Sequence, residues 1–259
     1  MAFRNGLGYS LYADSHAAGN VTAEDVRDLH TQAISNPNNV AVLGTGISTE
    51  SLAKLFETAF SSHKASAATP TPSAAPGCAT AYHGSTTRVA SVHGPQAIFI
   101  GSGSTTTASV SALHALAAHL NPVPALKWAG SAAPVASAIP AGINGRSMLL
   151  PYSDATLIGV VLEGNASAAL KEGAKAVVGA IKDAAAGKVG KEELTRVVAR
   201  AKFQLAAGIK AREGLVGVFG PKVLKREKVS VQETLDGIQA VNKMSLSQVS
   251  GSGQQEFRC

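Results

Sequence analysis

The sequence predicts an α+β protein in which a layer of helices covers one face of a β-sheet. Short apolar runs bounded by glycine and proline indicate strands between residues 79 and 164. Most of the remainder carries apolar residues at helical spacing on one side only, which is typical of helices packed against a sheet. No apolar run reaches the roughly 18 residues that a membrane-spanning helix needs.

Charge is unevenly distributed along the 259 residues, whose formal net charge is +6. The segment from Lys171 to Lys228 holds 14 basic and 6 acidic residues, a local net charge of +8. Such a segment can bind nucleic acid, anionic lipid or an acidic protein. Here Glu is interleaved at helical spacing, and the aromatic residues are scattered. We therefore interpret it as the solvated face of helices and expect no nucleic-acid partner.

The first segment, residues 1–63, predicts a helix, a strand and a second helix. Thr22, with Asp25 three residues later, is a predicted N-cap for the first helix. Residues 38–46 are bounded by turn residues and predict a buried strand. Residues 48–60 carry one apolar stripe and predict the second helix. A single strand has no sheet partner in this segment, so its neighbours must come from elsewhere.

Residues 64–78 are rich in Pro, Ala, Ser and Thr without periodicity, and they predict an extended linker. We place a domain boundary there. A second domain is predicted over residues 79–249, and residues 250–259 form an atypical tail.

The second domain predicts strands first and helices after them. Its early β-runs are short and separated by glycine, which indicates a meander or hairpins. The last predicted helix opens on a capping box of Ser230 and Glu233. The predicted strands are residues 79–84, 85–91, 95–102, 146–153 and 156–163, and the predicted helices are residues 105–120, 170–187, 194–205 and 230–241.

Gly101 and Gly103 lie where a predicted strand runs into a helix, which is the layout of a phosphate-binding loop. A dinucleotide fingerprint would require a third glycine at Thr106, and no Lys follows for a Walker-type loop. The small residues also suit a capped strand-to-helix turn. We expect Gly101–Thr107 to be such a junction and the chain to bind no nucleotide or other cofactor.

The seven histidines do not predict a metal site. His114 and His119 are five residues apart, about 140° around a helix axis, so they do not share a face. His83 and His93 precede glycines at predicted strand ends. No H-E-x-x-H, H-x-x-E-H or G-x-S-x-G pattern occurs in the chain. We expect no metal ligands and no catalytic residues.

The order of pieces after the linker resembles the second domain of one family, the mitochondrial processing peptidases and respiratory core proteins, relatives of the insulinase-type zinc peptidases. Tyr82, Gly84 and Arg88 match the family's Y-x-G-G-E-x-R opening. Residues 152–164, "YSDATLIGVVLEG", resemble the Y-S-D-x-G-L-F-G strand pair of the core proteins. Upstream, residues 5–11 and 21–48 resemble the end of the family's first domain, so the resemblance covers nearly all of residues 1–248.

This resemblance implies a two-domain subunit, each domain a layer of helices on a mixed, largely antiparallel sheet, paired with a homologous subunit around a cavity. Residues 1–63 would be the tail of the first peptidase-like domain. In the active peptidases zinc is held by H-x-x-E-H in the first domain, in a region that this chain does not include. Noncatalytic processing subunits carry a glycine-rich loop; at the corresponding residues 129–147 this chain has small residues but no glycine run.

The absence of a glycine run at these residues favours the respiratory core proteins. The alternative is a non-catalytic, presequence-binding subunit of the processing peptidase. The implied function is a structural subunit of mitochondrial ubiquinol–cytochrome c reductase, peripheral on the matrix side of the inner membrane. The implied partners are a homologous core protein and other respiratory subunits, and the basic helices are compatible with anionic lipid.

Residues 1–63 and the tail after about Val249 are expected to be poorly ordered or loosely packed. Ser245 and Gln248 form a predicted capping box, but "GSGQQEFRC" follows with neither a helical stripe nor a strand. Relatives continue there with a helix and a closing strand, which implies that the last strand is missing and that a sheet edge is exposed.

Overall fold

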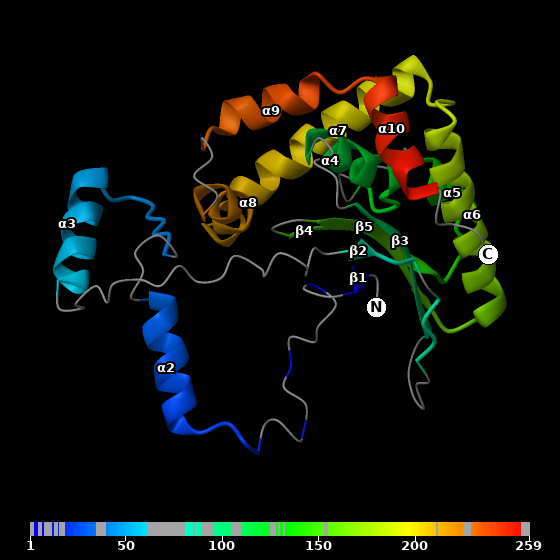
Figure 1. The fold of residues 1–259 in the computed structure, drawn as a ribbon. Helices are drawn as coiled ribbons and strands as arrows, with labels where there is room; N and C mark the ends of the chain where they lie inside the picture. The colour runs from blue at the N-terminus through cyan, green and yellow to red at the C-terminus, as the bar shows by residue number, and fades with distance from the viewer. Residues whose placement is uncertain are drawn as a thin grey trace. The chain divides into compact units, whose positions relative to one another are not determined.

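The computed structural model divides the chain into two compact units (Figure 1). Unit 1 comprises Met1–Gly8, Thr80–Ala207 and Ser230–Cys259; unit 2 comprises Tyr9–Ala79 and Gly208–Val229. The structure describes residues 3–4, 7, 12, 15, 19–34, 40–61, 81–84, 86–89, 96–104, 110–124, 128, 130–131, 133–152, 155–210, 212–224 and 229–254.

The centre of unit 1 is a three-stranded antiparallel sheet in the order β3-β5-β4. Its strands are β3 (Gln96–Ser104), β4 (Asn144–Pro151) and β5 (Thr156–Gly164). Alternate side chains of a strand point to opposite faces. On β5 one such row, Ile158, Val160 and Leu162, is buried. Among the described strands, β3 and β4 each pair on one side only.

A layer of helices lies along one face of the central sheet (Figure 1). Three of them pack on one another and on the sheet: α4 (Val110–Leu120), α6 (Ser167–Ala185) and α10 (Lys243–Gln254). A short helix, α5 (Pro134–Ala138), packs on α4 and α6. The predicted α+β class is confirmed: apolar helix stripes cover one face of an antiparallel sheet.

Two further helices of unit 1 follow their predicted patterns. The helix α7 (Lys191–Lys210) buries Val197, Val198, Ala201 and Leu205, and α9 (Val231–Gln239) packs on α4. The Ser230 hydroxyl accepts from the Glu233 N–H at 3.2 Å, which confirms the predicted cap.

A small second sheet covers one end of the central one. Its strands β1 (Phe3–Arg4) and β2 (Ala81–Tyr82) pair antiparallel. The buried ring of Phe3 makes edge contacts with Tyr82, at 5.7 Å between ring centroids, and with Tyr152, at 6.2 Å. Residues 3–4 thus belong to unit 1, although the sequence groups them with residues up to 63. The predicted domain boundaries themselves remain predictions.

Unit 2 holds α2 (Ala23–Ile34), α3 (Thr49–Phe60) and α8 (Arg212–Leu224). The predicted cap of α2 is present: the Thr22 hydroxyl and N–H donate to the Asp25 carboxylate at 2.7 and 2.9 Å. These hydrogen bonds hold the pKa of Asp25 below its ordinary value. Every described side chain of α2 is exposed, and α3 buries none.

Two predicted strands are wrong in the parts that the structure describes. Residues 40–46 form no strand, and Val42 is 45% exposed. Of residues 85–91, positions 86–89 are described, and they too form no strand. The physical reason is the same for both: a β-run becomes a strand only where a neighbouring strand satisfies its backbone N–H and C=O groups.

The described structure extends a helix, α10, into the predicted tail as far as Gln254. Loose packing of the residues after about Val249 stays a prediction. The helix α10 begins at Lys243 and is capped by Asn242, three residues before the predicted cap Ser245. The side-chain oxygen of Asn242 accepts from the Ser245 N–H at 2.9 Å. The helix continues through two glycines that disfavour it, while Leu246 is buried. Residues 255–259 lie outside the described residues. None of the described helices is long and apolar enough to cross a membrane.

Candidate functional site

Gly101 and Gly103, which have the spacing of a phosphate-binding loop, lie inside the strand β3. Gly101 is directly opposite Gly159 of β5, and Gly103 is opposite Leu157. The ring of Phe99 lies against both Gly101 and Gly159, where a Cβ at either position would be within 2.7 Å of it. The predicted junction over Gly101–Thr107 therefore starts too early: the strand runs to Ser104, and residues 105–109 lie outside the described part.

The described titratable side chains do not gather into a ligand set. No group of three or more His, Cys, Asp or Glu that could hold a metal occurs among the residues described. His114 and His119 both lie on α4, the first half-buried and the second 3% exposed.

The structure instead brings His119 to a polar cluster at the start of α7. Glu193, in the first turn of α7, places its Oε1 atom 3.6 Å from the Nδ1 atom of His119. Its other oxygen, Oε2, accepts from the N–H of Gly190 at 3.3 Å. One carboxylate therefore both caps α7 and faces the end of α4.

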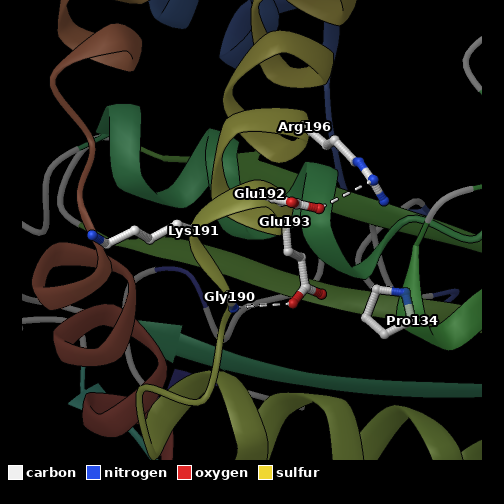
Figure 2. A pocket seen from close by; sticks show the side chains of 6 residues that line it. All are labelled: Pro134, Gly190, Lys191, Glu192, Glu193 and Arg196. Atoms are coloured by element: carbon white, nitrogen blue, oxygen red, sulfur yellow. Dashed lines mark hydrogen bonds and ion pairs between the residues drawn. The ribbon is translucent and has the colours of Figure 1, made fainter.

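An open pocket of about 470 Å³ lies beside this carboxylate (Figure 2). Glu192 and Arg196 form an exposed ion pair across one turn of α7, at 3.7 Å. Figure 2 shows this pair and the Gly190–Glu193 hydrogen bond at the same rim. The lining residues carry no hydroxyl or thiol that could act as a nucleophile; they are Pro134, Gly190, Lys191, Glu192, Glu193 and Arg196.

Burial dominates the electrostatics of His119. Its transfer from water lowers the pKa of the imidazole below the ordinary value of 6.5, and the opposing effect of Glu193 is smaller. The imidazole is therefore neutral at pH 7. Its Nδ1 atom is buried and has no hydrogen-bond partner, since 3.6 Å is too long for a hydrogen bond.

A second contact joins the segment after α4 to α7. The Arg200 guanidinium donates from Nη2 to the carbonyl oxygen of Val123, and its Nε atom is buried without a partner. Burial lowers the pKa of Arg200 below its ordinary value. Sequence patterns do not reveal either contact, because residues 119 and 193, or 123 and 200, are far apart in the chain.

Two curated relatives carry the name cytochrome b–c1 complex subunit 2, mitochondrial. The subunit from Cryptococcus neoformans is 38% identical over 235 residues, which are 86% of this chain and 51% of the relative. The chain is therefore similar to cytochrome b–c1 complex subunit 2 along most of its own length. The Neurospora crassa subunit 2 is 31% identical over 252 residues, 95% of this chain and 54% of its own length. No family model matches the chain.

The chain thus spans about half the length of the curated subunit 2 relatives that it matches. The predicted resemblance to the respiratory core proteins is confirmed, since subunit 2 is a core protein.

Two solved structures support the same architecture. A chain of complex III2 from Candida albicans, with Inz-5 bound, superposes with a TM-score of 0.76 at 16% identity. A protease from Helicobacter pylori superposes with a TM-score of 0.67 at 18% identity. In both cases 93% of this chain and 58% of the other are covered. At such identities the likeness shows the fold alone, and it is consistent with the α+β class.

Proposed function

We propose that the chain is a non-catalytic structural core subunit, core protein two, of mitochondrial ubiquinol–cytochrome c reductase, the cytochrome b–c1 complex or complex III. The observation that carries this proposal is the 38% identity with a curated subunit 2 over 86% of the chain. It acts as a scaffold, peripheral to the inner membrane on the matrix side. Its partners are the homologous core protein one and other respiratory subunits.

The geometry supports a role in assembly rather than in peptide hydrolysis. The zinc peptidases of this fold need a converging set of His and Glu ligands. Here His119 is buried against one carboxylate, and Glu192 at the pocket forms an ion pair with Arg196. The side chains that the described helices direct at the sheet are apolar, as a packing scaffold requires.

The outer face of α6 favours this function over the alternative, a presequence-binding subunit of the processing peptidase. Lys171, Lys175 and Lys182 lie within about 40° of one another around the helix axis, and all three are exposed. A receptor for basic presequences needs acidic surface. The lysine row is instead compatible with anionic lipid or an acidic neighbouring subunit.

Affinity purification from fungal mitochondria tests the proposal. A tagged chain is expressed beside the tagged full-length Cryptococcus neoformans subunit 2 as the positive control. We expect the cytochrome b–c1 subunits to be recovered with both, no stoichiometric zinc by elemental analysis, and no cleavage of a presequence peptide. Recovery with the processing peptidase in place of cytochrome subunits would contradict the scaffold function, and so would stoichiometric zinc.

A further inference from the structure

His119 is an ionisable side chain that is almost completely buried. It lies in the last turn of α4, 3% exposed, and its Nδ1 atom lacks a hydrogen-bond partner. A buried polar atom without a partner is costly, and a buried charge is more costly still. Taking up a proton at this position therefore requires either a counter-charge or access to water.

Glu193 can supply the counter-charge, but its carboxylate also caps α7. Its Oε2 atom accepts from the N–H of Gly190 and so caps the first turn of α7. Its Oε1 atom lies 3.6 Å from the Nδ1 atom of the imidazole. The side chain is 35% exposed, so water screens its charge. These two features explain why Glu193 raises the pKa of His119 by less than burial lowers it.

The other charged groups on elements around α4 are placed differently. Those on α6 and α9 are exposed, as is Arg146 on β4, whereas Glu163 on β5 and Lys243 on α10 are partly exposed. The short helix α5 carries no charged residue. On α7, Arg196 pairs with Glu192, and Arg200 donates to Val123. The described charge that acts on His119 is therefore that of Glu193.

We propose that His119 and Glu193 form an acid-sensitive trigger at the junction of α4 and α7. On acidification one proton passes from solvent to the imidazole, so that both ring nitrogens carry hydrogen. The exposed carboxylate of Glu193 balances the buried imidazolium only in part, and the junction opens to let water reach His119. Glu193 sets how far the pH must fall before this happens.

The sign of the effect follows from linkage. The folded-state pKa of His119 lies below its ordinary value of 6.5, so the stabilising contribution is complete above that pH. It is lost as the pH falls below 6.5 and through the folded-state pKa. One proton accounts for at most about a tenfold rise in the opening constant per pH unit.

Amide hydrogen exchange of the full chain, corrected for the intrinsic pH dependence of exchange, tests the trigger. In peptides covering residues 115–123 and 188–197, we expect opening to increase as the pH falls from about 7.5 to about 5.5. The His119→Gln variant, which cannot take up this proton, is expected to lose that dependence. Glu193→Gln is expected to increase the opening at acid pH, because the counter-charge is gone.

Glu192→Gln is the matched control, because Glu192 is one residue away, exposed and paired with Arg196. Its opening is expected to depend on pH in the same way as that of the unaltered chain. Opening that does not change with pH in the unaltered chain would overturn the proposal, as would equal effects of the two glutamate variants. If His119→Gln does not fold, the comparison of the unaltered chain with the two glutamate variants still decides. The result is independent of whether the chain assembles into complex III.

Discussion

At the residue scale, glycine is used in this sheet to make room for aromatic rings. Gly101 and Gly159 face each other across β3 and β5, and the ring of Phe99 covers both. At Gly103 a Cβ would lie 2.3 Å from the ring of Tyr82. An aromatic ring over a glycine shields the backbone and restores some of the packing that a glycine in a strand forgoes.

Gly101→Ala is expected to destabilise the chain by about 1–3 kcal/mol. The new Cβ would lie 2.5 Å from the carbonyl oxygen of Ile158, which belongs to the central strand and cannot move aside. Gly179→Ala is the matched control: it is a helical glycine with open space around its Cβ position. It is expected to stabilise the chain by up to about 1 kcal/mol. Urea denaturation of both variants measures the difference, and equal effects would contradict the packing argument.

At the element scale, α10 shows how tertiary contacts decide whether a weak helix forms. Its sequence, KMSLSQVSGSGQ, contains two glycines and four serines, which are poor helix formers. Against this, Asn242 caps its start, and the helix packs on α4, α6 and β3. A helix of this composition would be marginal alone, so its packed face must stabilise it.

Leu246→Ala is expected to cost about 2–5 kcal/mol of unfolding free energy, because Leu246 is 1% exposed and its removal leaves a cavity beneath α10. Met244→Ala, on the same helix but at a side chain that is 70% exposed, should change the free energy by less than about 0.5 kcal/mol. Thermal melts of the two variants give the comparison. A small effect at Leu246 would mean that α10 is not part of the core.

At the scale of the whole molecule, the two units differ in how much apolar surface they bury. Of the buried hydrophobic residues in the described part of the chain, all but Phe219 lie in unit 1. In unit 2 the stacked rings of Phe56 and Phe60, 4.2 Å apart, lie on a helix with no buried residue. Local stability follows the density of buried contacts, so the two units should open independently.

Amide exchange should separate the units. We expect the amides of α2 and of residues 40–46 to exchange at nearly the unprotected rate, since their described side chains are exposed or half-buried and form no sheet. The amides of β5 should be protected up to the global unfolding free energy, because this strand is paired on both sides. Strong protection across residues 40–46 would show that the segment has a strand partner.

Local chemistry and periodicity determined most of the elements. Thr22, Ser230 and the left-handed Gly187, which follows the end of α6 with φ +69°, mark helix ends because caps depend on neighbouring residues only. The apolar run within Tyr152–Gly164 predicts the central strand β5, and one-sided stripes predict α6 and α7. The family resemblance also follows from the order of these pieces.

Only the tertiary structure decided which patterns became structure. Residues 40–46 and 86–89 have strand-like sequences but join neither sheet of the described structure. The helix α10 has an irregular sequence but is capped by Asn242 and buries Leu246. The contact between His119 and Glu193 is decided in the same way. Helical spacing places the two residues on separate elements, and only the packing of α4 near the start of α7 brings a buried imidazole within 3.6 Å of a capping carboxylate. Pairing, burial and charge proximity are long-range properties, so a local pattern cannot specify them.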